Sequence, residues 1–153
     1  MLNFNGDESR LDKGPGGSLW TWNLRDAKAT TTYVMNGNEK GEEYHPNHTY
    51  FGFRYAELTA TDDVTINNIK AQVVGTDLTE WGTFKCSDSN INRLYSNVWW
   101  GQRGNFMSIP TDCPQRDERL GWTGDTQIFS RTALYNSDAA EFYRKWRRYN
   151  RYF

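Results

Sequence analysis

Four short stretches in the first half of the chain are predicted to be β-strands, and apolar and polar residues alternate along the last two of them. An alternation with a period of two predicts β-strands that bury one face. The clearest case runs from Thr49 to Ala60, and Asp62 with Asp63 then supplies a turn before the next stretch. The close spacing of these strands predicts an antiparallel β-sandwich. The four predicted strands cover residues 19–24, 30–36, 49–60 and 64–74.

The period of the pattern changes near Cys86. From there, apolar residues recur at intervals of three and four, which predicts a helix with one apolar face. Ser87 or Asp88 can cap its N-terminus, because both side chains accept hydrogen bonds from the first backbone N–H groups. The predicted apolar face comprises Ile91, Leu94, Tyr95, Val98 and Trp99.

Two further helices are predicted in the last part of the chain. One covers Thr126–Tyr135, with Asp125 at its cap position. The other opens at Ser137 or Asp138, and Glu141 follows Asp138 at the spacing of a capping box. Helical spacing then predicts aromatic residues on one face and arginines on the opposite face. These two sets are Phe142, Trp146, Tyr149 and Phe153, and Arg144, Arg148 and Arg151.

Strands therefore come first and helices second, which favours a multidomain protein that contains both α and β structure. We expect residues 1–85 to be the C-terminal part of a β-sandwich domain. We expect residues 86–153 to be the N-terminal part of a helical domain. Neither part carries enough elements to close a core, so the sequence is interpreted as a fragment of a larger protein.

Composition indicates folded protein and argues against two classes of partner. Aromatic residues make up 16% of the 153 residues, more than a disordered chain would carry. A net charge of -1 argues against nucleic acid as a partner. No stretch approaches the ~20 apolar residues that span a membrane, and no signal peptide is visible. The two cysteines, Cys86 and Cys113, are expected to be free thiols.

The candidate chemistry lies in one charged segment, "TDCPQRDERLGWTGD", from Thr111 to Asp125. It holds four acids, two arginines, two glycines and a tryptophan between two predicted helices. Cleavage of a glycosidic bond needs a carboxylic acid that protonates the leaving oxygen and a second carboxylate that activates water or attacks. Charged side chains hold sugar hydroxyls, and a tryptophan covers the apolar face of a sugar ring. The segment is therefore a candidate sugar-cleaving site.

A longer segment, "NRLYSNVWWGQRGNFMSIPTDCPQRDERLGWTGDTQIFSRTALYN", resembles the central signature of bacterial α-L-rhamnosidases, glycoside hydrolase family 78. Upstream, "YHPNHTYFGFRY" resembles the strand that precedes the catalytic domain of that family. The likeness covers roughly residues 33–153. It implies a β-sandwich portion followed by the first helices of an (α/α)6 barrel. It also implies removal of terminal α-L-rhamnose with inversion of configuration.

The resemblance also implies roles for individual residues. Glu118 matches the general acid of the family. The general base is a glutamate of a later part of the barrel, beyond Phe153, so the isolated chain is expected to be inactive. The implied partners are a rhamnose-containing glycoside or polysaccharide and water, with no cofactor and no metal. The residues that match the rhamnose pocket are Asp112, Arg116, Trp122 and Asp125.

Some residues of this segment also have simpler structural interpretations. Asp125 can cap a helix, and Asp112 can form a turn. Asp117 and Arg119 are interpreted as structural salt-bridge partners. The two histidines lie three residues apart in a polar loop and supply too few ligands for a metal site: His45 and His48.

Two other functions remain open from the residues alone. A sandwich rich in Trp and Tyr is compatible with a non-catalytic carbohydrate-binding module, although such a module needs no group of acids. The segment "RKWRRYNRYF" interleaves basic and aromatic residues, as single-strand binders do. Its helical spacing favours a solvated outer helix instead.

Overall fold

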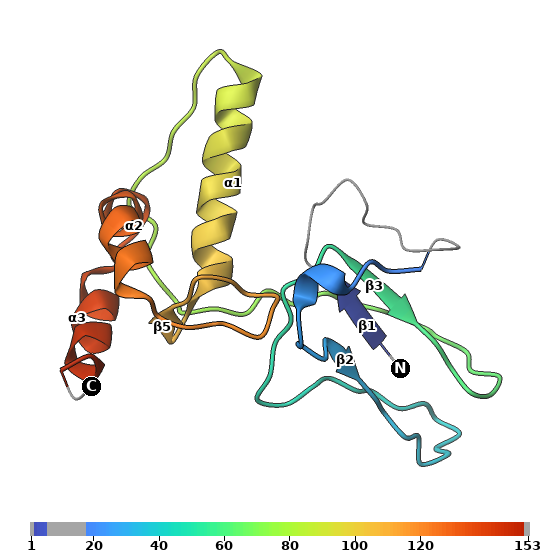
Figure 1. Ribbon diagram of the computed structural model, residues 1–153. Helices are drawn as coiled ribbons and strands as arrows, with labels where there is room; N and C mark the ends of the chain where they lie inside the picture. Colours follow the sequence, from blue (N-terminus) through green and yellow to red (C-terminus); the bar gives the residue numbers. More distant parts are fainter. Residues whose placement is uncertain (1, 6–17, 152–153) are drawn as a thin grey trace. The chain divides into compact units, whose positions relative to one another are not determined.

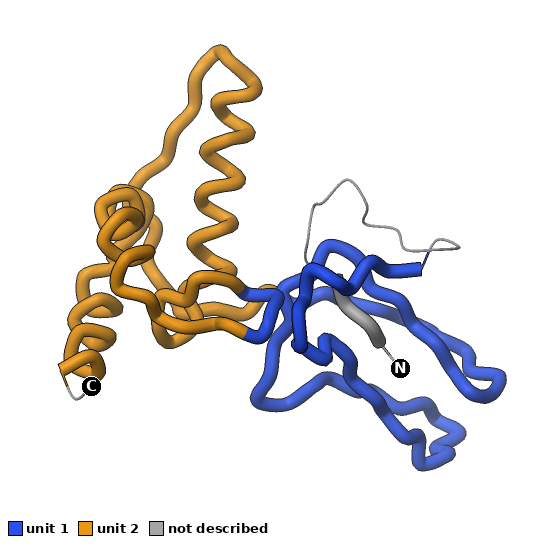
Figure 2. The backbone as a smooth tube through the Cα atoms, viewed as in Figure 1, with its two compact units in different colours: residues 1–72, 114–117 blue, residues 73–113, 118–153 orange. Residues whose placement is uncertain are grey.

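A computed structural model describes residues 2–5 and 18–151 of the chain (Figure 1). The chain divides into two compact units (Figure 2). The first comprises residues 1–72 and 114–117, and the second comprises residues 73–113 and 118–153. The predicted domain boundary at residue 85 stays a prediction, because compact units follow contacts within the chain and do not define domains.

The first unit contains a three-stranded antiparallel sheet. Its strands are β1 (Leu2–Asn5), β2 (Thr30–Thr31) and β3 (Tyr55–Leu58), in the order β2-β1-β3. In the central strand, Leu2 pairs with Thr31 on one side and with Leu58 on the other. The buried cluster of this unit comprises Leu24 and Ala29, with Ala27 and Phe51 packed against them.

The predicted strands of this unit are only partly right. Of residues 30–36 and 49–60, only Thr30–Thr31 and Tyr55–Leu58 form strands. Trp22–Leu24 forms a 3-10 helix, η2, in place of the strand predicted there. Within the described residues, none of the stretch 64–74 is a strand, and every side chain in it is exposed. Alternation stabilises a strand only where another layer buries one face, and no described layer covers this stretch.

The second unit is mainly helical. Its elements are α1 (Ser89–Asn105), β4 (Phe106–Met107), β5 (Ile109–Pro110), α2 (Thr123–Asn136) and α3 (Ala140–Tyr149). Asp88 caps α1, because its Oδ1 accepts hydrogen bonds from the N–H of Asn90 at 2.8 Å and of Ile91 at 3.4 Å. This confirms one of the two predicted caps. Across the described residues, no helix is long and apolar enough to cross a lipid bilayer.

The predicted starts of the other two helices are wrong. Helix α2 begins at Thr123 with Trp122 at the N-cap, so Asp125 lies inside the first turn. Helix α3 begins at Ala140, and its N-cap residue, Ala139, provides no side-chain cap. The predicted capping box between Asp138 and Glu141 therefore does not form.

The late start of α3 has a structural cause. The N–H of Asp138 donates to the carbonyl of Thr79 at 2.8 Å, and Ser137 forms an antiparallel bridge with Glu80. Ala139 is 0% exposed. Residues 137–139 are therefore held by contacts with residues 79–80, and the helix starts only after them.

An aromatic core holds the helices of this unit together. The rings of Phe106 and Phe142 stack with centroids 4.5 Å apart and planes 12° from parallel. Ala133 and Ala139 complete the buried cluster. The apolar face predicted for α1 contributes little to this core, since Ile91 is 47% and Leu94 is 61% exposed.

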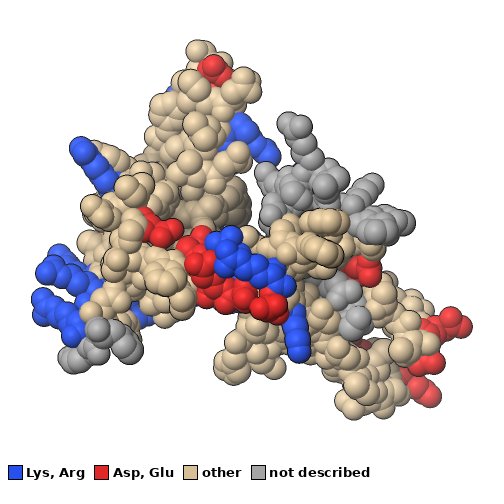
Figure 3. Space-filling model, in the orientation of Figure 1, with Lys and Arg blue, Asp and Glu red and all other residues tan. Residues whose placement is uncertain are grey.

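The faces predicted for α3 agree with the structure only in part, because Tyr149 of the predicted aromatic face is 55% exposed. Phe142 is buried, Trp146 is half-buried, and Arg144 and Arg148 are exposed. Lys and Arg side chains gather over this helix (Figure 3). Phe153 of the predicted aromatic face lies outside the described residues. The separation of aromatic and basic residues supports a solvated outer face over single-strand binding.

A buried polar network joins α1 to the end of α2. The side-chain amide of Gln102 donates to the Ser137 hydroxyl at 2.8 Å. The Gln102 Oε1 accepts from the amide of Asn136 at 2.8 Å. All three residues are buried, so these hydrogen bonds satisfy polar groups that are shielded from water.

Replacement of Gln102 by alanine is expected to lower the free energy of unfolding by about 1–3 kcal/mol, because Asn136 and Ser137 lose their buried partner. Thermal unfolding of the protein that contains these residues measures the effect. Gln127→Ala in α2 is the matched control, since that side chain is exposed. Equal stability of the two variants would contradict the role of the network.

Candidate active site

The charged segment begins at a hairpin formed by β4 and β5. Ser108 connects the two strands with φ 67°, a left-handed conformation that is uncommon for a residue with a side chain. The ammonium of Lys145 on α3 donates to the Ser108 carbonyl at 3.1 Å and to its hydroxyl at 3.0 Å. Thr111 then donates to the Asn105 carbonyl from both its N–H and its hydroxyl, each at 2.9 Å. These contacts fix the start of the segment against α1 and α3.

Asp112 closes the loop that follows. Its N–H donates to the Leu120 carbonyl at 3.1 Å, and its carboxylate Oδ1 accepts from the Leu120 N–H at 2.9 Å. The residues between them therefore form a closed loop whose two ends are joined. This explains how Glu118 returns to the neighbourhood of Asp112 although six positions separate them in sequence.

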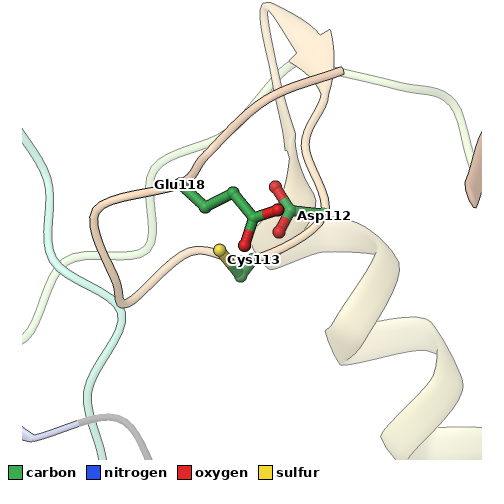
Figure 4. A group of neighbouring side chains, drawn as sticks. All are labelled: Asp112, Cys113 and Glu118. Atoms are coloured by element: carbon green, nitrogen blue, oxygen red, sulfur yellow. The ribbon is translucent and has the colours of Figure 1, made fainter. Parts of the chain in front are cut away.

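The side chains of Asp112 and Glu118 point toward one another, with the thiol of Cys113 beside them (Figure 4). One ligand atom from each of the three residues lies within 4.8 Å of the others. Cys113 is buried, whereas both carboxylates are partly accessible. The loop therefore presents two neighbouring carboxyl groups, as the sequence-based interpretation of this segment expects.

These three donors are also the candidate metal ligands of the described residues. A structural zinc site uses four ligands, and its thiolates and imidazoles dominate the set. Here two of the three donors are carboxylates and the third is a single thiol, with no imidazole among them. His45 and His48 belong to no such group of donors in the described part of the chain. We assign no metal to this loop.

Trp122 contacts Glu118 directly. Its indole Nε1–H donates to Glu118 Oε1 at 2.9 Å. The ring is 47% exposed, so part of it stays available to a ligand. Because Trp122 is also the N-cap residue of α2, the start of this helix sets where the ring lies.

Gly121 and Trp146 hold this part of the loop in place. A Cβ atom added at position 121 would lie 2.6 Å from Trp146 Nε1 and 3.4 Å from Ile109 Cδ1. Only glycine allows the backbone next to Trp122 to approach the indole so closely. The sequence places Trp146 on an apolar face, but its contact with the loop is a long-range one that no local pattern shows.

Asp125 and Asp112 line the same cleft of the second unit, whose volume is about 600 Å³. Tyr143 and Phe129 form part of its wall. Burial raises the pKa of Tyr143 to about 12, so its hydroxyl stays neutral. The structure thus brings Asp112 beside Glu118 on one side and into a shared cleft with Asp125 on the other.

Arg116 is the one predicted site residue outside the second unit. Residues 114–117 belong to the first unit, where the Gly52 N–H donates to the Pro114 carbonyl at 3.2 Å. The other four predicted residues, Asp112, Glu118, Trp122 and Asp125, lie in the second unit. Cys86 and Cys113 are free cysteines, as predicted.

Comparison with known families bears directly on this loop. Residues 79–151 match the family model of the bacterial α-L-rhamnosidase 6 hairpin glycosidase domain. Residues 7–75 match that of the bacterial α-L-rhamnosidase concanavalin-like domain. The chain belongs to the bacterial α-L-rhamnosidase family. Both the predicted resemblance and the predicted fold class, a sandwich portion followed by the start of a six-hairpin barrel, are confirmed.

Individual α-L-rhamnosidases are similar over most of the chain. The enzyme of Streptomyces avermitilis is 46% identical over 134 residues, which make up 86% of this chain and 13% of that protein. One from Formosa agariphila is 44% identical over 135 residues, 86% of this chain and 14% of that protein. The chain therefore spans only a small part of the length of these relatives.

Solved structures agree with this similarity. The α-L-rhamnosidase of Dictyoglumus thermophilum matches 94% of this chain and 16% of its own, with a TM-score of 0.83 and 43% identity. The Streptomyces avermitilis α-L-rhamnosidase complexed with L-rhamnose matches 95% of this chain and 14% of its own, with a TM-score of 0.82 and 42% identity.

The close approach at Gly121 generates a prediction. Gly121→Ala is expected to cost about 1–3 kcal/mol of stability, because the new methyl group overlaps the Trp146 ring. Thermal unfolding measures this. Gly101→Ala is the control, since a Cβ atom there meets nothing within 4 Å. If Trp146→Phe does not relieve any of the cost of Gly121→Ala, the assigned contact is wrong.

Proposed function

We propose that these residues form part of an inverting α-L-rhamnosidase, with Glu118 as its general acid. The observation that carries the proposal is the closed loop, which holds the Glu118 carboxyl group between Asp112 and the indole N–H of Trp122. A glycosidase needs such an acid, held at a fixed position beside a sugar pocket. The substrate is a rhamnose-containing glycoside or polysaccharide, and water is the second reactant.

The other site residues bind the sugar in this proposal. Asp112 and Asp125 accept hydrogen bonds from rhamnose hydroxyls, and the cleft that both line gives the sugar a place. Trp122 covers the apolar face of the ring, and Arg116 donates to a hydroxyl. The structure of a family relative with L-rhamnose bound supports this choice of sugar.

Asp112 is poorly placed to be the general base. Inversion requires roughly 6.5–9.5 Å between the two carboxyl groups, so that a water molecule fits between base and sugar. The carboxylate oxygens of Asp112 and Glu118 lie within 4.8 Å. Asp112 is therefore assigned to sugar binding, and the proposal follows the family resemblance in placing the base on a glutamate outside these 153 residues.

A carbohydrate-binding module accounts for the loop less well. Such a module holds sugars with aromatic and neutral polar groups and does not need two neighbouring carboxyl groups. The match of residues 79–151 is to a glycosidase domain, which also favours catalysis.

Replacement of Glu118 by glutamine in the enzyme encoded by the complete reading frame tests the proposal. Glutamine keeps the size of the side chain but cannot donate the proton, so kcat on an aryl α-L-rhamnoside is expected to fall by about 10²–10⁴-fold. Rhamnose binding, measured by calorimetry, is expected to stay within about threefold, because sugar contacts from Asp112 and Asp125 remain.

Asp117→Asn is the matched control, since it neutralises the neighbouring exposed carboxylate. It is expected to keep near wild-type kcat. Wild-type turnover by Glu118→Gln would refute the assignment of the acid. A folded wild type that binds rhamnose and hydrolyses no rhamnoside would refute the proposed reaction.

A further inference from the structure

The indole N–H of Trp122 makes a hydrogen bond that sugar stacking does not require. It donates to Glu118 Oε1 at 2.9 Å, across the start of α2. The backbone of Trp122 is anchored on both sides. Its carbonyl accepts from the Thr126 N–H at 3.2 Å, and the preceding Gly121 lies against Trp146. The N–H donor is thus held by the fold at one end of the Glu118 carboxyl group.

This contact distinguishes the two oxygens of the acid. An indole N–H can only donate, so its partner oxygen must act as an acceptor. In a neutral carboxylic acid, the carbonyl oxygen is the stronger acceptor and the hydroxyl oxygen carries the proton. Acceptance by Oε1 therefore favours the form of neutral Glu118 that carries its proton on Oε2.

We propose that Trp122 is a positioning residue for catalysis, which fixes the rotation of the Glu118 carboxyl group and directs the proton on Oε2 toward the leaving oxygen. This inference rests on the proposed function. It gives Trp122 a second task beside sugar contact. The N–H bond lies in the ring plane, so the hydrogen bond covers neither face of the ring, and both tasks can be performed by one side chain.

The step balances without a further reactant. Glu118 Oε2–H transfers its proton to the glycosidic oxygen, and the bond from that oxygen to the anomeric carbon breaks with its electron pair going to the oxygen. Water adds to the anomeric carbon, and its proton goes to the carboxylate base. Glu118 ends as a carboxylate that still accepts from the Trp122 N–H.

A comparison of leaving groups separates positioning of the acid from sugar stacking. Methanol is a poor leaving group, so cleavage of a methyl rhamnoside depends on protonation of the glycosidic oxygen. Dinitrophenolate is a good leaving group, so cleavage of a dinitrophenyl rhamnoside needs little help from an acid. Loss of stacking on the sugar ring weakens the binding of both substrates to the same extent. Loss of acid positioning lowers kcat mainly for the methyl rhamnoside.

Two variants of the full-length enzyme remove the N–H. Trp122→Phe keeps an aromatic ring, and replacement of Trp122 by benzothienylalanine keeps the shape of indole with sulfur in place of N–H. If Trp122→Phe does not fold, the benzothienylalanine variant is used for the test. Trp100→Phe is the control, because Trp100 has a similar exposure, 51% against 47%. Glu118→Gln marks the full loss of the acid.

General acid catalysis raises the rate by about 10²–10⁴-fold. An acid whose proton points in the wrong direction retains part of this rate enhancement. We expect the Trp122 variants to lose about 10-fold or more in kcat on the methyl rhamnoside and less than about threefold on the dinitrophenyl rhamnoside. KM of the benzothienylalanine variant is expected to remain near the wild-type value.

Equal losses on the two substrates, a change in KM alone, or no change would overturn the inference and leave Trp122 as a sugar contact. The wild type is measured first. If it hydrolyses neither rhamnoside, the proposed function fails and the inference falls with it. If it hydrolyses both and the variants lose activity equally, only the inference fails.

Discussion

The double hydrogen bond between Asp112 and Leu120 is the constraint on which the candidate site depends. One bond joins the Asp112 N–H to the Leu120 carbonyl, and the other joins the Leu120 N–H to the Asp112 carboxylate. Together they turn a polar segment without regular structure into a closed loop. The backbone of such a loop would otherwise lose conformational entropy with little compensation. Because the loop is closed, Glu118 lies beside Asp112 and accepts a hydrogen bond from the N–H of Trp122.

The surrounding helices keep this loop in one place. Thr111 is bonded to the end of α1, Lys145 of α3 holds the hairpin turn at Ser108, and Trp146 of α3 lies against Gly121. The aromatic core around Phe106 and Phe142 joins α3 to the hairpin. A charged loop is thus supported by an apolar core. Such support lets two carboxyl groups remain neighbours without the loop opening.

Local patterns predict the helices of this chain better than its strands. The cap at Asp88 and, except for the exposed Tyr149, the opposed faces of α3 follow from spacing alone and are present in the structure. The start of α2 was predicted three residues late, because the sequence offers Asp125 as a cap while the loop places Trp122 there. Residues 64–74 alternate like a strand but stay exposed, since strand formation depends on partners that a pattern does not contain. The motif located the candidate site, whereas the Gly121–Trp146 and Trp122–Glu118 contacts depend on tertiary structure. The roles of the five site residues remain predictions.

The most direct measurement is a crystal structure of the complete enzyme, carrying Glu118→Gln, with L-rhamnose bound. The account predicts that the loop is closed by Asp112 and Leu120, with the sugar in contact with Asp112, Asp125 and the Trp122 ring. It also predicts that the side chain at position 118 lies within hydrogen-bond distance of the anomeric oxygen. Rhamnose bound away from residues 112–125, or a loop opened between Asp112 and Leu120, would contradict it.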